Sequence, residues 1–522
     1  MPSWLNNAVF YEIYPQSFQD SNADGIGDLN GIISRLDYVR SLGCNAIWLN
    51  PLYVSPFRDA GYDVADYKKV APRYGSNGDL YRLFGEAHRR GMHVLLDLVP
   101  GHTSEKHPWF LESCRPERNA YTDRYIWTDS AFQGIANHLY IAGDTDRDGC
   151  YMLNFFKSQP ALNYGWLHPN EEWQMGIDDP ACVATRDAMV EVMTFWLSHG
   201  ADGFRVDMAD SLVKGDDEKK SGTCAVWRDI FSKVRPKFPD AAFVSEWDNP
   251  ELSLNGAGFD MDFYLNNRGN GYTTLARDFV NYDANYKRGV TRPEDHSYFK
   301  KDAGGDITRF LKDYLKRYEA TKDHGFISIP TGNHDTPRMA GSLTDREALL
   351  AEAFILTLPG VPFLYYGDEI GMRYQKGLVS KEGGYQRTGT RTPMQWDATK
   401  NHGFSTGAED TVYLPTDPSA DAPTVEEEEK DPASHLNTIR NILILRENTE
   451  ELQADGSFEV VSRGNEVPFL YRREDMLLGV NPTGETREVE IDRDRSVVLK
   501  IGEVTPGAKS ITMGPQSFCI LL

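Results

Sequence analysis

Short runs of β-branched and aromatic residues alternate with longer stretches of helical periodicity along most of the chain, and this alternation restricts the fold more than any other feature. Eight runs have the length and composition of strands: residues 9–14, 46–50, 93–99, 203–207, 242–246, 261–265, 326–331 and 361–366. Helical patterns fall between them, among others at residues 32–42, 79–90, 188–197, 307–318 and 345–356. Repeated strand–helix units pack around a parallel sheet and can close into a barrel. We therefore predict an α/β protein with a (β/α)8 TIM barrel, whose chemistry lies at the carboxyl ends of the strands.

Two segments depart from this repeat. The connection after the third strand is long and rich in Asp, Asn, Gly and aromatic residues, which predicts an inserted domain over the barrel mouth. A last helical pattern at 434–446 closes the barrel, and beyond it short alternating strands are expected at 458–461, 469–472, 477–480, 487–491 and 518–521. The expected divisions are a first barrel part at 1–102, an inserted domain at 103–176, a second barrel part at 177–448 and a C-terminal antiparallel β-sandwich at 449–522.

The charge balance excludes several classes of partner. The chain has 55 basic and 78 acidic residues, a formal net charge of −23, which repels nucleic acids and anionic membranes. No run of about twenty apolar residues occurs, and the start of the chain lacks the basic and apolar regions of a leader. The six cysteines are widely spaced without a Cys-x-x-Cys pair, which favours free thiols. We therefore expect a cytoplasmic protein with a neutral or cationic partner.

The fourth predicted strand carries the first indication of a reactive site. Side chains alternate along a strand, so Arg205 and Asp207 share one face. A guanidinium beside a carboxylate lowers the carboxyl pKa and keeps the group an anion that is able to attack. An ordinary ion pair at a strand end would give the same pattern. The residues at the other strand ends therefore decide between a structural ion pair and a reactive site.

Those strand ends supply further polar groups. Asp97 and His102 follow the third strand, Glu246 ends the fifth, and His334 and Asp335 follow the seventh. Taken alone, each histidine would favour a structural imidazole over a functional one. In a barrel, however, all of these groups converge on one rim. Cleavage of a glycosidic bond requires one ionised carboxylate and one protonated acid on either side of the bond, which such a rim can provide.

The two carboxyl groups differ in their surroundings. Glu246 lies among the apolar neighbours Phe243, Val244 and Trp247, so desolvation would raise its pKa and hold its proton. We therefore expect Glu246 to be the acid and Asp207 to be the nucleophile.

Taken in order, these motifs resemble those of the α-amylase family of glycoside hydrolases, in particular its oligo-1,6-glucosidase and α-glucosidase branch, over essentially the whole chain. The main motifs are Asp97-Leu-Val-Pro-Gly-His102, Gly203-Phe-Arg-Val-Asp207, Val244-Ser-Glu246-Trp and Gly332-Asn-His-Asp335. The supporting motifs are Tyr11-Glu-Ile-Tyr14-Pro, Gly61-Tyr-Asp63, Gln159-Pro-Ala-Leu-Asn163 and Arg391-Thr-Pro-Met-Gln-Trp396.

The resemblance implies double displacement with retention of configuration. Asp207 would form a β-glycosyl-enzyme, Glu246 would act as general acid and base, and Asp335 would be a third carboxylate that grips the sugar hydroxyls. An Asp63–Arg391 pair would close the far end of the site, which implies exo-action. The side chains implied to hold the non-reducing glucose are Tyr62, stacked beneath it, and Asp63, His102, Arg205, His334 and Arg391. We also predict the retaining separation of about 5–5.5 Å between the carboxyl groups of Asp207 and Glu246.

A candidate metal-binding loop lies near the start of the chain. Residues 20–28 space oxygen ligands at alternate positions around a Gly turn, as in an EF-hand loop, although the twelfth position is Gly31 rather than Glu. An Asp- and Asn-rich turn without metal has the same spacing. The resemblance implies a structural Ca²⁺ site here, for which Mg²⁺ could substitute. Its ligands would be Asp20, Asn22, Asp24, the Ile26 carbonyl and Asp28.

Three positions depart from the family pattern. Gly101 stands where an Asn usually precedes His102, so we do not expect the second calcium that this Asn helps to hold in amylases. Ala161 replaces the usual Asp, which weakens the link to the 1,6-specific members. Met208 follows the expected nucleophile, where its unbranched thioether can fill space beside the leaving sugar adaptably. The linkage preference is therefore open.

The sequence hypothesis is a retaining α-glucosidase that acts on short gluco-oligosaccharides, with α-1,4 links ahead of α-1,6 links. A transglycosylase or isomerase, similar to trehalose synthases or sucrose-acting members, would use the same intermediate and differ in what intercepts it. A non-catalytic binding protein with the same barrel is a third class, because a fold alone does not fix a function. The expected partner is a small oligosaccharide, with no nucleic acid or membrane, and the oligomeric state is not predicted.

Overall fold

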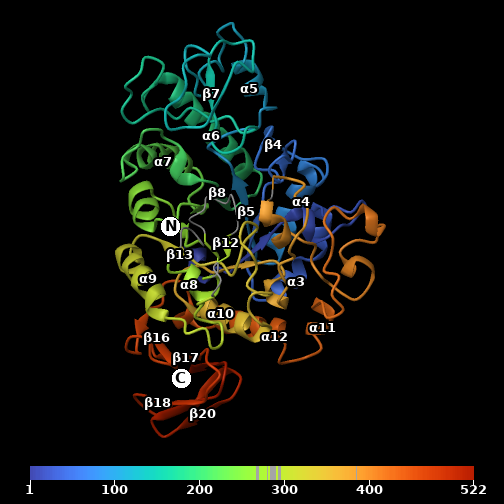
Figure 1. The fold of residues 1–522 in the computed structure, drawn as a ribbon, viewed down its shortest axis with the longest axis vertical. Coiled ribbons are helices and arrows are strands. Elements are labelled where there is room, and N and C mark those ends of the chain that lie inside the picture. The colour runs from blue at the N-terminus through green and yellow to red at the C-terminus, as the bar shows by residue number, and fades with distance from the viewer. Residues whose placement is uncertain (266–269, 279, 282–289, 292–294, 384) are drawn as a thin grey trace.

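A closed barrel of parallel strands forms the centre of the protein. The computed structural model describes residues 1–265, 270–278, 280–281, 290–291, 295–383 and 385–522 (Figure 1). The barrel strands are β1 (Phe10–Ile13), β2 (Ala46–Leu49), β5 (His93–Leu98), β8 (Gly203–Val206), β9 (Ala242–Ser245), β10 (Met261–Phe263), β13 (Phe326–Ser328) and β14 (Phe363–Tyr365). They form an eight-stranded sheet in the order β13-β10-β9-β8-β5-β2-β1-β14. The Thr331 N–H donates to the Phe363 carbonyl at 2.9 Å, which joins the two outer strands. The predicted (β/α)8 barrel is therefore confirmed.

The strand register brings the site residues together. Asp97 of β5 pairs with Arg205 of β8, and Arg205 pairs in turn with Val244 of β9. The neighbouring backbones approach closely at Gly203, where φ is 151° and an added Cβ would lie 1.9 Å from the Ala242 carbonyl oxygen. Only glycine fits there, and the close approach fixes the height of β8 relative to β9.

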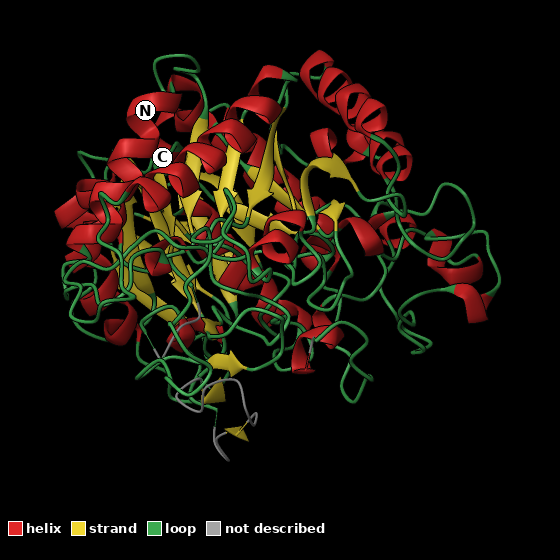
Figure 2. Cartoon of the chain, turned by 90° about the horizontal axis from the view of Figure 1, so that it is seen from above, coloured by secondary structure: helices red, strands yellow, loops and turns green. Residues whose placement is uncertain are grey.

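Helices lie outside the strands, as Figure 2 shows. The longer ones are α4 (Asn77–Arg89), α6 (Pro180–Ser198), α7 (Ser221–Val234), α9 (Ile307–Thr321), α10 (Asp345–Thr357) and α12 (His435–Glu447), with a π-helix at Glu251–Ala257. The predicted helix at 32–42 is instead two short helices, α2 (Leu29–Ser34) and α3 (Leu36–Ser41), because Arg35 leaves helical geometry at φ −110° and ψ 4°. Within the described part of the chain, no helix is both long enough and apolar enough to cross a membrane.

Shorter elements fill the connections between the barrel units. They are α1 (Pro15–Phe18), β3 (Tyr53–Val54), β4 (Asp66–Val70), α8 (Thr273–Ala276), β11 (Val280–Asn281), β12 (Val290–Thr291) and α11 (Val425–Glu428).

The long connection after β5 forms a body of its own at one end of the molecule (Figure 1). It contains α5 (Pro108–Ser113) and a hairpin of β6 (Tyr140–Ala142) and β7 (Cys150–Met152), with much irregular backbone. Phe110, Trp127 and Tyr151 pack together in it, with ring centroids 5.0–6.2 Å apart. Its last strand-like stretch pairs with the barrel rim, where His102 bridges to Ala161. The inserted segment is thus attached beside the carboxyl end of β5.

The C-terminal strands form two sheets at the opposite end, shown in red in Figure 1. Five strands are ordered β15-β16-β17-β22-β19 and three are ordered β18-β21-β20. Their bounds are β15 (Glu459–Val460), β16 (Phe469–Arg473), β17 (Met476–Asn481), β18 (Arg487–Glu490), β19 (Val497–Ile501), β20 (Val504–Gly507), β21 (Ser510–Met513) and β22 (Ser517–Leu521). Leu470 and Leu521 of one sheet share a buried cluster with Ile511 and Met513 of the other. The predicted antiparallel C-terminal domain is confirmed, and β19, β20 and β21 are additions to the five strands expected.

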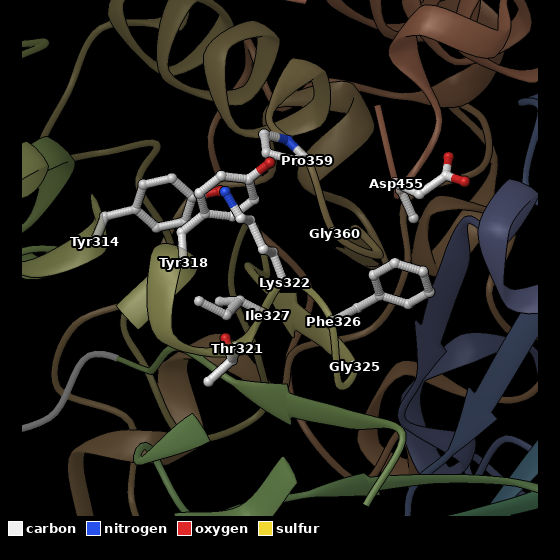
Figure 3. A pocket seen from close by; sticks show the side chains of 11 residues that line it. Tyr314, Tyr318, Thr321, Lys322, Gly325, Phe326, Ile327, Pro359, Gly360 and Asp455 are labelled. Carbon is white, nitrogen blue, oxygen red and sulfur yellow. The ribbon is translucent and has the colours of Figure 1, made fainter. Parts of the chain in front are cut away.

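A small cavity lies at the amino end of β13, where the barrel meets the C-terminal part (Figure 3). Its volume is about 30 Å³, and Tyr314, Tyr318, Lys322 and Asp455 are among its lining residues. The Tyr314 hydroxyl is buried without a hydrogen-bond partner among the described residues. The cavity is at the end of the barrel away from the strand ends that carry the predicted chemistry.

Candidate active site

One guanidinium gathers three carboxyl groups from neighbouring strands. Arg205 Nη1 lies 3.0 Å from Asp97 Oδ1 and 3.0 Å from Asp207 Oδ1, and Arg205 Nη2 lies 2.8 Å from Glu246 Oε2. Asp207 and Glu246 each come directly after the last residue of a strand, β8 and β9. Arg205 is only 1% exposed, so this contact is protected from solvent. The structure thus brings together the predicted nucleophile and the predicted acid.

Burial dominates the acidity of both carboxyl groups. It raises the pKa of Asp207 to about 7 and the pKa of Glu246 to about 8, although Arg205 acts in the opposite direction on each. Arg205 lowers the pKa of Asp207, as the sequence predicts, but desolvation outweighs this effect, so the net pKa is raised and not lowered. The order of the two values is nevertheless the expected one, since Glu246 keeps its proton to higher pH than Asp207 does.

The two oxygens of Glu246 are not equivalent. Oε2 accepts a hydrogen bond from the Met208 N–H at 2.9 Å and forms an ion pair with Arg205 Nη2 at 2.8 Å. Met208 presents its N–H from left-handed backbone geometry, at φ 41° and ψ 46°. Because Oε2 is occupied by the Met208 N–H and the Arg205 guanidinium, the proton of a neutral Glu246 resides on Oε1. The Glu246 side chain is 24% exposed, so a substrate can reach it.

Glu246 also lies close enough to Asp207 to offset part of the rise in the pKa of Asp207 that burial causes. The two groups are therefore neighbours. The separation of about 5–5.5 Å expected for a retaining enzyme stays a prediction.

Asp335 is the third predicted carboxylate, and cations surround it. Its Oδ1 lies 2.7 Å from Arg391 Nη2 and 3.0 Å from Arg387 Nη1, and its Oδ2 lies 3.6 Å from His334 Nε2. Burial alone would raise the pKa of Asp335, but the guanidinium groups of Arg387 and Arg391 hold it well below its usual value. Asp335 is thus an ionised group, and its side chain is 25% exposed.

The predicted ion pair between Asp63 and Arg391 is wrong. Asp63 is buried and accepts hydrogen bonds from the backbone N–H groups of Arg58 and Asp59, each at 3.1 Å. These bonds fix the turn before Tyr62 and leave Asp63 oriented toward its own loop. Arg391 pairs with Asp335 instead.

The ion pair expected between Asp63 and Arg391 has a counterpart in two residues that the sequence did not single out, Asp59 and Arg387. Arg387 Nη2 lies 3.0 Å from Asp59 Oδ1, while Nη1 of the same guanidinium contacts Asp335. Gln159 of the inserted segment donates to Asp59 Oδ2 at 2.8 Å. Asp59 and Arg387 each stand four positions before the residues chosen from the motifs. Both segments contain two suitable residues, and spacing alone does not distinguish them.

Tyr62 is anchored at the base of the site. Its ring stacks on His334, with centroids 5.4 Å apart and an angle of 12° between the planes. Its hydroxyl lies 3.0 Å from Asp97 Oδ2 and 2.8 Å from His334 Nε2. Both predicted residues are therefore at the site, and their contacts with a sugar stay predictions.

His102 has a structural environment. Its Nε2 lies 3.0 Å from the Tyr62 carbonyl oxygen, and its Nδ1 lies 3.1 Å from Asn154 Nδ2. Burial lowers the pKa of His102 to about 4, so the ring is neutral, donates to the carbonyl and accepts from Asn154. Both nitrogens are thus engaged by the protein, and the predicted sugar contact of His102 stays a prediction.

Asn154 of the inserted segment explains the unusual Gly101. A Cβ at position 101 would lie 2.8 Å from Asn154 Nδ2. The Asn154 side chain bonds His102, contacts Met208 Sδ at 3.9 Å and accepts from Lys214 Nζ at 3.3 Å. Asn154 therefore occupies the space beside residue 101 and connects the inserted segment to the loop that follows Asp207.

The proposed calcium loop is an ordered turn. Both oxygens of Asp20 and one oxygen of Asp24 accept backbone N–H groups within the loop, and Asn22 donates to Asp24. Asp28 accepts the Ser21 and Gly31 N–H groups, each at 2.8 Å. The oxygen-only donor set of Asp20, Asn22, Asp24, Ile26 and Asp28 is of the kind that Ca²⁺ prefers. Across the described residues, no group of three or more His, Cys, Asp and Glu side chains is placed to hold a metal ion. The calcium therefore stays a proposal.

Comparison with known proteins gives consistent results. The family model for the alpha amylase catalytic domain matches residues 12–455. A glucan 1,6-alpha-glucosidase of Streptococcus pneumoniae is 31% identical over 99% of this chain and 99% of its own. A trehalose synthase/amylase of Mycobacterium tuberculosis is 34% identical over 91% of this chain and 80% of its own. An oligo-1,6-glucosidase of Parageobacillus thermoglucosidasius is 29% identical over 90% of this chain and 87% of its own.

Solved structures agree. The trehalulose synthase of Pseudomonas mesoacidophila superimposes with a TM-score of 0.81 at 26% identity, over 100% of this chain and 99% of its own. A mutant isomaltulose synthase of Erwinia rhapontici in complex with D-glucose superimposes with a TM-score of 0.80 at 26% identity, over 100% of this chain and 99% of its own. The barrel, the carboxyl groups gathered at its rim and the match over residues 12–455 lead to one conclusion: this chain belongs to the α-amylase family and is a glycoside hydrolase.

Proposed function

We propose that the protein is a retaining α-glucosidase that releases glucose from the non-reducing end of short gluco-oligosaccharides. The observation that carries this proposal is the contact of Arg205 with both Asp207 and Glu246. A carboxylate and a carboxylic acid held beside each other are the pair that acetal cleavage needs.

In the first step, the Asp207 carboxylate attacks the anomeric carbon. Glu246 donates the proton of Oε1 to the glycosidic oxygen, so the bond from the anomeric carbon to that oxygen breaks and the leaving sugar departs as an alcohol. A β-linked glycosyl-enzyme results. Arg205 remains in contact with both groups and stabilises the negative charge that passes to Glu246.

In the second step, Glu246 is a carboxylate and takes a proton from a water molecule, whose oxygen attacks the anomeric carbon and releases Asp207. Two inversions give net retention. Asp335 is held ionised by its cations, and we assign to it the hydroxyl groups of the glucose ring as partners.

The Arg387–Asp59 contact supports exo-action. It links Asp335 to a loop that Gln159 of the inserted segment also holds, so three separate parts of the chain meet at that side of the site. We propose that this contact closes the site beyond the non-reducing glucose, the role first expected of Asp63 and Arg391.

A second candidate is an isomerase or transglycosylase of the same family. The relative named trehalose synthase/amylase and the superimposable trehalulose and isomaltulose synthases favour it. Such an enzyme forms the same intermediate, and a sugar hydroxyl then replaces water as the attacking group. Two relatives are named as 1,6-glucosidases, which supports α-1,6 links as substrates beside α-1,4 links.

A product assay distinguishes these candidates. The protein is incubated with maltose, maltotriose, isomaltose, sucrose and p-nitrophenyl α-glucoside, and the products are followed by ¹H NMR from the first minutes. Initial release of α-glucose supports the glucosidase, whereas a new disaccharide supports the isomerase. D207A serves as the blank. Initial release of β-glucose refutes both candidates, and so does the absence of product from every substrate.

We also propose that the loop at Asp20, Asn22, Asp24, Ile26 and Asp28 binds Ca²⁺ as a structural ion, with Mg²⁺ as a substitute. The spacing of its oxygen donors supports this. Removal of the metal with EDTA should lower Tm, and added Ca²⁺ should restore it in the native chain but not in D24A. An unchanged Tm refutes the site.

The acidic charge supports a cytoplasmic location as a further proposal, since it disfavours anionic membranes and nucleic acids. Fractionation of the native host tests it: activity in the washed membrane or outside the cell would contradict it.

A further inference from the structure

A carboxyl group lies beneath the site and is not used in the mechanism above. Glu12 of β1 is 0% exposed. Its Oε1 lies 2.8 Å from His334 Nδ1 and 3.2 Å from Asn50 Nδ2. Its Oε2 has no hydrogen-bond partner among the described residues. Burial of an ionised carboxylate with one oxygen that accepts no hydrogen bond costs free energy. The carbonyl oxygen of a neutral acid tolerates the lack of a hydrogen-bond partner better.

The hydrogen bonds above Glu12 determine where the protons lie. Tyr62 Oη is 3.0 Å from Asp97 Oδ2 and 2.8 Å from His334 Nε2, and it has one proton to give. Asp97 is paired with Arg205, so its carboxylate oxygen is the acceptor that most needs that proton. The Tyr62 hydroxyl then accepts from His334, which places the ring proton on Nε2. His334 Nδ1 is left as an acceptor, with Glu12 Oε1 at 2.8 Å and Asn50 Nδ2 at 3.0 Å beside it.

The acidities of the two groups agree with this assignment. Burial raises the pKa of Glu12 well above its usual value, and the lowering effects of Asn50 and Arg205 do not cancel that rise. Burial likewise lowers the pKa of His334 well below its usual value. A neutral acid and a neutral imidazole are therefore the stable pair.

We propose that Glu12 is a positioning residue that, as a neutral acid, donates a hydrogen bond to His334 Nδ1 and so fixes the Nε2–H form of the ring. The fixed N–H points to Tyr62 Oη and to the Asp335 side of the site. Glu12 does not touch the substrate. It acts through His334, which it holds in one tautomer and one orientation.

Two substitutions test this role, and their activity readout rests on the proposed glucosidase or isomerase function. In E12Q the amide N–H can still donate to Nδ1, so we expect kcat/KM within about threefold of the wild type and the same pH profile. In E12L the donor is lost, and we expect kcat/KM to fall about tenfold to a hundredfold, mainly in kcat. Thermal unfolding shows whether each variant is folded. Equal losses in E12Q and E12L, a shifted pH profile in E12Q or full activity in E12L would overturn the proposal.

A spectroscopic measurement needs no activity. The infrared difference between the wild type and E12Q near neutral pH should show the carbonyl stretch of a protonated carboxyl group in the wild type alone. In ¹⁵N-histidine-labelled protein, the signals assigned with H334N should show a protonated Nε2 and an unprotonated Nδ1. A carboxylate band at Glu12 or a proton on Nδ1 refutes the proposal. If the wild type acts on no glucoside but both signatures are present, only the proposed function fails.

Discussion

At the scale of single residues, Arg205 lowers the pKa of Asp207 by less than burial raises it. It holds Asp207 and Glu246 within reach of each other, and burial sets both pKa values close to neutrality. Because the carboxyl groups interact, their protons leave in two steps that belong to the pair.

The pH dependence of kcat/KM should follow from these values. Asp207 must be ionised, so activity rises as the pH increases through about 7, and Glu246 must be protonated, so activity falls above about 8. We expect a narrow bell with its maximum between these values, measured on p-nitrophenyl α-glucoside at constant ionic strength. A plateau that extends from pH 5 to 9 would contradict this assignment.

Gly101 gives a second prediction at this scale. In G101A the new Cβ would meet Asn154 Nδ2, so we expect Asn154 to move away from His102 and Met208. Stability should fall by about 1–3 kcal/mol, as for other overpacked sites, and kcat/KM should fall with it. Urea unfolding and initial rates measure the two effects.

The matched control is G85A. Gly85 lies inside α4, and an added Cβ would meet no atom within 4 Å. Alanine is the better helix former, so this variant should be unchanged or more stable by up to about 1 kcal/mol. Equal behaviour of G101A and G85A would show that Asn154 does not restrict position 101.

The sequence could predict that Arg205, Asp207 and Glu246 meet, because each stands at a strand end that the fold brings to one rim. The sequence could not show that Arg391 pairs with Asp335, or that the arginine that pairs with the loop of Asp59 is Arg387. Asp59 and Asp63 lie in one loop. The Ser55 hydroxyl and the Arg58 and Asp59 N–H groups donate to Asp63, and Asp59 pairs with Arg387 instead.

At the scale of elements, the loop before β4 and the loop after β14 are joined through Arg387. R387L would leave Asp59 and Asp335 without this shared cation. We expect the non-reducing sugar to lose its alignment and kcat/KM on maltose to fall by about a hundredfold or more.

The control for R387L is R373L. Arg373 pairs at 3.1 Å with Asp421, which is 81% exposed, so the same substitution there removes a solvent-exposed pair. Such pairs contribute little, and kcat/KM should be unchanged. A similar loss in both variants would mean that Arg387 has no special part in the site.

Elements with strong periodicity were predictable, and elements held by distant contacts were not. All eight barrel strands are buried runs with a clear pattern. Strand β20 contains Pro506 and Gly507, both unfavourable in strands, and it forms only because β21 pairs with it. The break between α2 and α3 at Arg35 is likewise a matter of packing: the guanidinium lies 4.0 Å above the Trp396 ring, from a segment far along the chain.

At the scale of the whole molecule, the C-terminal sheets are fastened to the barrel at the end of α10. Arg473 of β16 is fully buried and donates to the Ser457 carbonyl at 2.8 Å and to the Thr357 carbonyl. Tyr471 Oη lies 2.6 Å from Thr357 Oγ1. The barrel and the C-terminal domain should therefore unfold together.

R473L tests this coupling. Several buried carbonyl oxygens would lose their donor, so we expect a loss of about 3 kcal/mol or more in the free energy of unfolding. The control is R493L, whose pair with Asp475 is exposed on both sides and should matter by less than about 0.5 kcal/mol. Near-UV circular dichroism and activity, followed in one urea titration, should change at the same concentration. Two separate transitions in the wild type would contradict the coupling.

The Arg387–Asp59 contact has a consequence for polymers. Under the proposed closure, the site would engage a glucan only at its chain ends, so turnover should follow the number of chain ends per gram and not the total length of chain. A highly branched glucan should therefore be consumed faster than the same mass of a linear one. Cyclic glucans, which have no chain end, should be left intact.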